Sequence, residues 1–363
     1  MLFAYTYVPH QMDKMQQFID FVFFKVWCEA PIGLQFHPDL FKDNAELQEI
    51  MSFFGFSAKA PERGKTFYKD VKQIYDLFAL LPPQDIDKFR EWYRNNNDIE
   101  NVCEDILAVQ PMRYVDFPVA HCALRDRLAS FFKDLYSKSL LGLAALKEKI
   151  GDIDDHYDAF VTINNEGKCP FCGIGDLFTV YHNKREAYDH YLPKALYPFN
   201  SINFKNLVPA CYHCNSSYKT SKDPAYIPKD PANGVAHRRR TFYPYRTNAE
   251  KLQILVNVAH SDYSALTPGD ISFEFGPKDM AEELATWCDV YGIEERYRGK
   301  LLAKNDGKYW LTQALDEWPS KGKGVAELLG ELALEADKYP VAECNFLKSA
   351  YLHGCLKAGI IRI

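Results

Sequence analysis

The sequence predicts a mainly α-helical protein with a small central module of two strands and a helix that a metal stabilises. Three observations support this fold class. Apolar residues recur at helical spacing through much of residues 1–158 and 247–363. Between them, residues 159–246 have shorter apolar runs and are rich in Gly, Pro, Asn and Cys. Four of those cysteines form two Cys-x-x-Cys pairs, so we expect three domains with these boundaries.

The N-terminal segment, residues 1–158, is expected to be a helical scaffold or partner-binding domain. One apolar face, formed by Met15, Phe18, Ile19, Val22, Phe23 and Val26, predicts a helix over Gln11–Trp27. Further helices are expected over Asn44–Phe54, Lys65–Leu80, Asp85–Asn95 and Leu124–Ile150, the last broken at most once. Turn signals at Pro82-Pro83 and Asn95–Asn97 separate some of them. We find no catalytic motif in this segment.

In the central segment, the helical spacing of apolar residues gives way to shorter apolar runs. Phe178–His182 and Ala187–Leu192 are expected to be two short strands, and Cys211–Lys219 to begin a helix. Pro224–Pro231 is expected to be an extended linker. After residue 246 the helical pattern returns, with one short strand over Ile271–Phe275. The helices expected there are Lys278–Tyr291, Ile293–Ala303, Lys308–Trp318, Gly324–Lys338 and Val341–Lys357.

The bulk composition is that of a globular protein: 47% of the 363 residues are hydrophobic and 25% are charged. No apolar run approaches the length of a membrane span, and the N-terminus lacks a basic leader, so we expect a cytoplasmic protein with no membrane partner. The net charge is −6, but residues 160–246 hold 12 Lys/Arg and 6 Asp/Glu. That segment is therefore +6 and the remainder −12, which favours an anionic substrate bound at one place over chance clustering.

The two Cys-x-x-Cys pairs are Cys169/Cys172 and Cys211/Cys214. In a reducing compartment such pairs are typical metal ligands, and four thiolates complete the tetrahedral shell of a structural zinc ion. His213 lies inside the second pair and is the alternative fourth ligand. Because so small a module buries little core, the metal is expected to supply folding energy.

Asp189-His190 lies between the two cysteine pairs. A carboxylate suits a hard divalent ion, and a histidine suits general-base chemistry near neutral pH. The segment is therefore expected to hold two sites, one that stabilises the fold and one that carries out a reaction.

Several motifs in a fixed order carry a resemblance to a known family. They are Asp189-His190-Tyr-Leu-Pro, then Asn206-Leu-Val-Pro, then Cys211-Tyr-His-Cys-Asn215, followed by Lys219. This order and spacing resemble the HNH nucleases of the ββα-metal superfamily, in the branch stabilised by zinc. The resemblance covers roughly 80 of the 363 residues. It implies a ββα-metal fold for the module and a metal-dependent endonuclease activity on DNA.

The resemblance also implies roles for single residues. His190 would be the general base that activates water, and Asp189 and Asn215 would hold the catalytic ion. The third motif position is often His in this family; Asn215 there favours magnesium or manganese. Asn206 would pin the loop behind the base and so orient it. Lys219 would contact a phosphate or would simply be solvated.

Arg238, Arg239 and Arg240 follow the motif by about 20 residues. They are expected either to neutralise DNA phosphates or to be a solvated run of charge.

The leading hypothesis is therefore an HNH endonuclease that cuts double-stranded DNA. Helical, acidic flanks around such a core resemble nucleases of bacterial phage-defence systems, in which an ATPase or sensor protein holds the nuclease. One alternative is a non-catalytic zinc module whose helical domains bind protein. Another is a restriction or homing enzyme that cuts defined sites alone. The oligomeric state is left open by the sequence.

Overall fold

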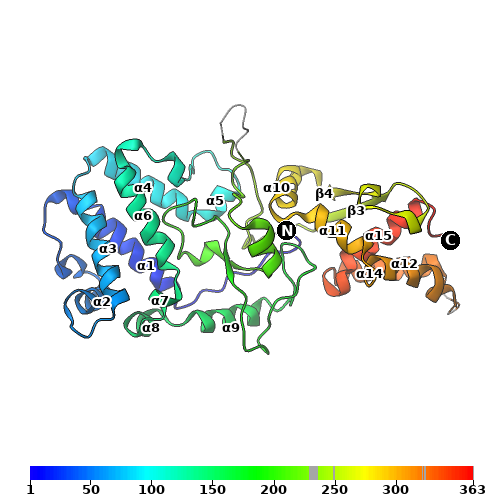
Figure 1. Ribbon diagram of the computed structural model, residues 1–363, viewed down its shortest axis with the longest axis horizontal. Helices are drawn as coiled ribbons and strands as arrows, with labels where there is room; N and C mark the ends of the chain where they lie inside the picture. The colour runs from blue at the N-terminus through cyan, green and yellow to red at the C-terminus, as the bar shows by residue number, and fades with distance from the viewer. Residues whose placement is uncertain (229–235, 248–249, 321, 323, 363) are drawn as a thin grey trace.

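The computed structural model describes residues 1–228, 236–247, 250–320, 322 and 324–362, and most of its elements are helices. A helical N-terminal lobe lies at one end of the elongated molecule, the cysteine-containing module lies in the middle, and a second helical lobe lies at the other end (Figure 1). The predicted mainly α-helical class is confirmed. Among the described residues, no helix is both long and apolar enough to cross a bilayer.

The N-terminal lobe follows the expected helices closely. Its first helix, α1, continues into a π-helical turn over Val22–Trp27. The helices of this lobe are α1 Asp13–Phe21, α2 Ala45–Phe56, α3 Glu62–Phe78, α4 Pro83–Asn97, α5 Ile99–Cys103, α6 Cys122–Leu135, α7 Lys138–Leu141 and α8 Ala144–Ile150.

Local chemistry sets several of these helix ends. The Asn44 side chain accepts a hydrogen bond from Leu47 N (3.1 Å) and caps α2, which satisfies one free N–H of its first turn. Pro83 begins α4, a position where the missing N–H costs nothing.

The expectation of at most one break in Leu124–Ile150 is wrong, because the chain leaves the helix twice. Ser137 and Leu143 both adopt extended backbone conformations, so α6, α7 and α8 are separate helices. The first break places Tyr136 outside α6, and this proves important for the site described below.

The module contains a short hairpin-like pair of strands. β1 (Tyr188–His190) pairs antiparallel with β2 (Leu207–Pro209), with Asp189 opposite Val208 and His190 opposite Leu207. A π-helix over His213–Lys219 follows β2. The order of strand, strand and helix is that of a ββα unit.

The strand expected over Phe178–His182 is wrong. That segment turns instead, with Thr179 N and its hydroxyl both at hydrogen-bond distance from His182 Nδ1 (3.0 and 3.1 Å). Its apolar side chains do not alternate into a core, because Phe178, Val180 and Tyr181 are all exposed. The partner of β1 therefore comes from the later Leu207–Pro209 segment.

The expected domain boundary at residue 158 falls inside a helix, α9 (Ile153–Ile163). The chain also begins against the module: Leu2 N donates to Pro170 O (2.8 Å) and Tyr5 N donates to Pro244 O (2.8 Å). Buried apolar residues from all three segments form one contiguous cluster. The lobes are therefore packed parts of one structure.

The C-terminal lobe combines helices with one hairpin. β3 (Gln253–Val258) pairs antiparallel with β4 (Ile271–Gly276), so the expected strand has a partner that the sequence did not indicate. The helices are α10 Ala281–Tyr291, α11 Ile293–Leu302, α12 Gly307–Thr312, α13 Trp318–Ser320, α14 Val325–Lys338 and α15 Asn345–Lys357.

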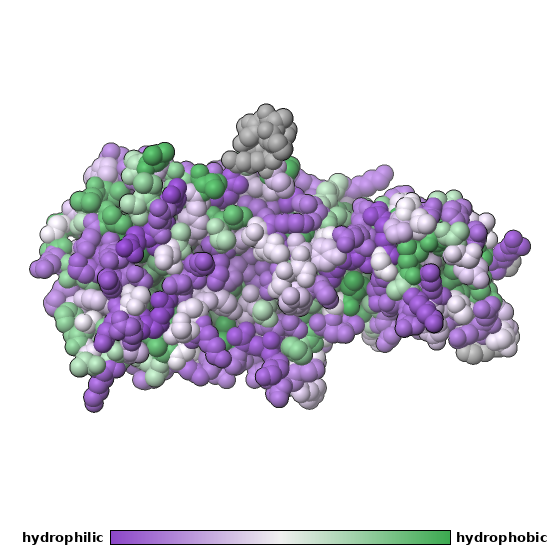
Figure 2. Space-filling model, viewed as in Figure 1, coloured by the Kyte–Doolittle hydropathy of each residue, from purple (hydrophilic) through white to green (hydrophobic). Residues whose placement is uncertain are grey.

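α15 packs directly on β3. A Cβ at Gly354 would lie 2.3 Å from Val256 O, so only glycine permits this approach. Hydrophilic residues cover most of the face in Figure 2, with apolar patches scattered over both lobes. Part of the expected linker, residues 229–231, lies outside the described residues; beside it, Tyr226 and Arg238 form an antiparallel bridge.

Candidate active site and metal centre

The two cysteine pairs converge in the structure. Cys169, Cys172, Cys211 and Cys214 are all buried, and their Sγ atoms lie within 4.8 Å of one another. Zn–S bonds of about 2.3 Å in a tetrahedron separate the sulfurs by roughly 3.8 Å. The Cys172 and Cys211 sulfurs lie 3.9 Å apart. This buried cluster could therefore bind a metal such as zinc.

Glycines shape the first cysteine pair. Cys169 N donates to Gly175 O (2.8 Å), and Gly173 N donates to Cys169 O (2.7 Å). Gly173 has a φ of +67°, and a Cβ at Gly175 would lie 2.7 Å from the Cys211 sulfur. The tight turn and the close approach of backbone to thiolate both depend on the absence of a side chain.

Side chains of the C-terminal lobe surround this cluster. Arg296 of α11 donates from Nη1 to Cys214 Sγ (3.1 Å). Trp287 Nε1 donates to Phe171 O (2.6 Å), and Tyr297 OH donates to Cys172 O (3.0 Å). A cationic donor to a thiolate offsets part of the negative charge of a four-thiolate metal site, so α10 and α11 provide its outer contacts.

His190 ends β1 with its ring half-buried. Its Nε2 lies 3.0 Å from Ser201 O. Because a carbonyl only accepts hydrogen bonds, Nε2 carries the proton and Nδ1 of the neutral ring is left as a base. Burial lowers the pKa of His190 to about 3, and the charges of Lys194 and Lys219 act in the same direction. The imidazole is therefore neutral at physiological pH.

Asp189 points to the other face of the strand and is buried. Its Oδ1 accepts a hydrogen bond from Lys219 Nζ (2.9 Å), and Lys219 Nζ also donates to His190 O (2.8 Å). Burial raises the pKa of Asp189, and the neighbouring Lys219 opposes that shift. The other oxygen, Oδ2, is buried and has no hydrogen-bond partner in the described part of the chain.

Lys219 therefore differs from the phosphate contact expected of it. Its side chain is 0% exposed and pairs with a side chain that is 4% exposed. A buried ammonium that must balance a buried carboxylate is not presented to a phosphate, nor is it solvated.

Asn206 is fully buried just before β2. Its Oδ1 accepts from Leu192 N (2.7 Å), and its Nδ2 donates to Leu192 O (3.0 Å) and Asn200 O (3.3 Å). These bonds tie down both ends of the loop that begins two residues after His190. Ser201, whose carbonyl holds His190, directly follows that loop.

Asn215 is half-buried in the π-helix that carries Lys219. Its carbonyl accepts from Thr220 N (2.9 Å), an i to i+5 bond of the wide π turn. Such turns occur often at functional sites. Because Lys219 contacts Asp189 and His190 O, this π-helix lies against β1.

All three side chains of the arginine run contact protein groups, and the Arg240 side chain stays 47% exposed, so the expected role of the run in DNA binding stays a prediction. Arg238 donates to Val102 O and Val109 O and pairs with Asp105 (3.0 Å). Arg239 pairs with Asp289 (2.7 Å), and Arg240 pairs with Glu283 (2.8 Å). Arg238 contacts the N-terminal lobe, whereas Arg239 and Arg240 both pair with acids of α10, so the run connects the two lobes.

The sequence did not indicate Tyr136 or Lys194. The Tyr136 ring lies edge-on to His190, with centroids 4.8 Å apart and an interplanar angle of 89°. Lys194 Nζ lies 5.5 Å from the centroid of the same ring. Tyr136 precedes His190 by more than fifty residues and has no motif, so no signal could have found it. Lys194 follows His190 by four residues, and its charge was the only indication.

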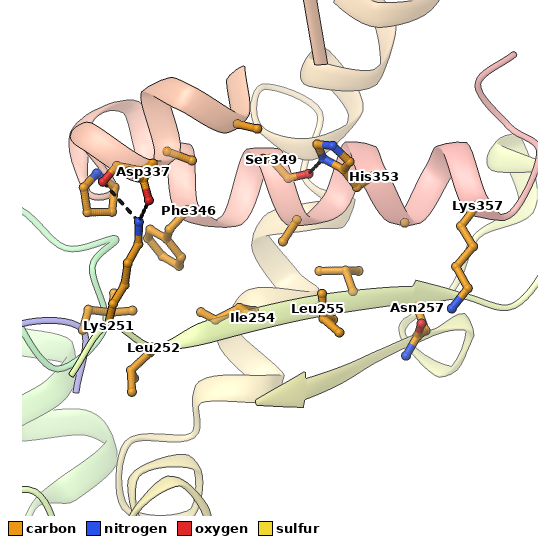
Figure 3. A pocket seen from close by; sticks show the side chains of 17 residues that line it. Lys251, Leu252, Ile254, Leu255, Asn257, Asp337, Phe346, Ser349, His353 and Lys357 are labelled. Carbon is orange, nitrogen blue, oxygen red and sulfur yellow. Dashed lines mark hydrogen bonds and ion pairs between the residues drawn. The ribbon is translucent and has the colours of Figure 1, made fainter. Parts of the chain in front are cut away.

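A separate hollow lies in the C-terminal lobe between β3 and α15 (Figure 3). It has a volume of about 400 Å³ and a lining that includes Leu252, Ile254 and Phe346. Lys251 and Asp337 form an ion pair at one end, and Lys357 lies at the other. An apolar groove of this kind suits packing rather than hydrolysis, so the candidate active site is the module.

Comparisons with known proteins add little. No known family profile matches the chain, and no solved structure matches it. Protein ea31 of Escherichia phage lambda is 39% identical over 75 residues, which is 20% of this chain and 22% of the phage protein. The chain thus matches only about a fifth of the length of that relative, whose name states no activity.

Proposed function

We propose that this chain is a metal-dependent endonuclease of the HNH type that hydrolyses phosphodiester bonds in DNA. One observation carries the proposal: a single strand–strand–helix unit brings together a neutral histidine base, a buried carboxylate and a loop pinned by an asparagine. A purely structural cysteine module has no need for those polar groups, whose burial costs free energy.

In the proposed reaction, Nδ1 of His190 takes a proton from water as the water oxygen bonds to phosphorus, and the bond from phosphorus to the departing oxygen breaks. The Ser201 carbonyl keeps the ring in the required tautomer. Solvent water supplies the proton that the departing oxygen needs.

Asp189 and Asn215 would be the ligands of a hard divalent ion. Asp189 has one buried oxygen without a partner among the described residues, and Asn215 carries an amide oxygen; magnesium and manganese accept such donors. When bound, the ion would stabilise negative charge on the reacting phosphate. Lys219 balances the carboxylate charge on its other oxygen. The four cysteines would hold a separate structural zinc.

Plasmid nicking tests the proposal. The wild-type chain should nick a supercoiled plasmid with magnesium or manganese and not with EDTA. His190→Ala should lower the rate by roughly 10²–10⁴-fold or more, because it removes the general base. His213→Ala is the matched control, since His213 is an exposed histidine of the same module.

Equal nicking by wild type and His190→Ala would refute the assignment. No nicking by a folded, zinc-loaded wild-type chain would favour a zinc module that binds protein. Cleavage at one defined sequence would favour a restriction or homing enzyme. A phage-defence role with an ATPase or sensor partner is a further proposal, based on the resemblance alone.

A further inference from the structure

Lys194 contacts the backbone of a second lysine, Lys133, and a ring that lies against His190. Lys194, in the loop after β1, donates from Nζ to the backbone carbonyl of Lys133 in α6 (3.3 Å). Its ammonium also lies over the ring of Tyr136, which in turn lies against the His190 ring. Only Tyr136 therefore separates this ammonium from the histidine.

The acid closest in sequence to this cluster, Asp134, is already paired with Arg63 (3.3 Å). Neither Lys133 nor Lys194 forms an ion pair within the residues that the structure describes. Burial and the nearby Lys133 lower the pKa of Lys194, and the charge of Asp134 opposes that shift. Two like charges whose neighbouring carboxylate is shared with an arginine favour an anion between or above them.

The Tyr136 ring also lines a cleft. The cleft has a volume of about 580 Å³ and includes Tyr136 and Tyr188 in its lining, whereas His190, Lys133 and Lys194 lie outside that lining. Tyr188 and His190 are two residues apart on β1, so both side chains point to the same face of the strand. The acids of this cleft are already paired, Asp152 with Lys147 and Asp154 with Arg185. An anionic strand in the cleft would therefore meet little unpaired negative charge.

We infer that Lys133 and Lys194 bind a backbone phosphate of the DNA next to the one that is cleaved. The N-terminal lobe, through α6 and Tyr136, then forms one wall of the active site. This inference rests on the proposed function, because it takes DNA as the ligand. It replaces Lys219 as the expected phosphate contact.

Binding of a fluorescent DNA duplex to the zinc-loaded chain, without added magnesium or manganese, tests the inference without cleavage. Each lost phosphate contact should lower the slope of log affinity against log salt by about 1. Because both lysines bind the same phosphate, Lys133→Ala/Lys194→Ala should show a slope shallower by about 1. Between 50 and 200 mM salt, the wild type should lose roughly fourfold more affinity than this variant.

The matched control is Lys42→Ala/Lys59→Ala, which removes the same charge from exposed lysines of the N-terminal lobe. It should retain the wild-type slope, as should Lys133→Arg/Lys194→Arg. Equal slopes for both alanine pairs would overturn the inference, even if the wild type cuts DNA.

A result in which DNA binding depends on the two lysines but cleavage is absent distinguishes the two proposals. If the Lys133/Lys194 variant loses its salt dependence but the wild type never cuts with any divalent ion, the phosphate site stands and the nuclease proposal fails. No binding by the wild type at low salt would overturn the inference.

Discussion

The buried pair of Asp189 and Lys219 provides the sharpest test of the module's internal electrostatics. Lys219→Met keeps most of the side-chain volume and removes the charge. In this variant the Asp189 carboxylate has lost its cation, although the Asp189 side chain is only 4% exposed. Breaking one partner of such a pair costs about 3–5 kcal/mol, because the remaining charge is buried and uncompensated. The free energy of unfolding should fall by that amount.

A second variant separates lost charge balance from lost packing. Asp189→Asn/Lys219→Met removes both charges, and replacing a buried pair by neutral groups is often close to neutral. Most of the lost stability should therefore return, although Asp189 is expected to be essential for cleavage. Lys222→Met is the matched control, since Lys222 is exposed three residues further on and its Nζ makes a surface hydrogen bond to Asp289 O (2.8 Å) rather than an ion pair. It should change stability by less than about 0.5 kcal/mol.

Urea denaturation followed by far-UV circular dichroism gives the midpoint and slope for each variant, compared at equal zinc content. Equal, small losses for Lys219→Met and Lys222→Met would refute the reasoning. So would a double variant as unstable as Lys219→Met, since the loss would then come from packing rather than from the unpaired charge.

Two further predictions concern acid stability and metal content. Burial and the nearby His10 lower the pKa of His156 to about 3, so between about pH 6.5 and 3 the unfolded chain binds a proton that the folded chain does not. The pKa of His190 is lowered in the same way, so each of the two histidines should cost about 1.4 kcal/mol of stability per pH unit below pH 6.5. Urea midpoints at pH 7 and 5 should show the full loss in wild type and in His37→Gln, and about half of it in His156→Gln. Elemental analysis should find about one zinc per chain, and Cys211→Ser should lose it and become insoluble. Arg296→Ala should retain zinc but release it faster to a chelator; unchanged release would show that the contact with Cys214 does not stabilise the metal.

The helices were predictable because periodic burial is local information. The predicted Asp85–Asn95 helix differs from α4 by two residues at each end. Three-residue strands carry no such period. Leu207–Pro209 is too short to show alternation, whereas the more strand-like Phe178–His182 has no partner that buries its apolar side chains. Pairing over long distances, rather than propensity, decides which segment becomes a strand.

In the candidate site, too, the features set by local sequence were predictable and those set by distant contacts were not. The spacing of Cys169/Cys172 and Cys211/Cys214 was sufficient to predict a metal cluster, because two short turns fix the geometry of each pair. The partner of Lys219 was not predictable, since a lysine in a helix can face solvent, phosphate or a carboxylate. Tyr136 reaches His190 only because α6 ends at Leu135, a detail that the apolar period of Leu124–Ile150 concealed.

The charge contrast along the chain has a different meaning in the folded protein. In the described part of the +6 segment, the cations that form ion pairs are Lys168, Arg185, Lys219, Arg238, Arg239 and Arg240. Four of these pairs use acids of the flanking lobes: Asp105, Asp154, Asp289 and Glu283. The acidic flanks therefore neutralise the module from within the structure. An isolated segment 160–246 would expose those cations and bind DNA through groups that the whole protein keeps covered. Among the cations of this segment that form no ion pair with described residues, Lys194 lies over the Tyr136 ring, next to the candidate base.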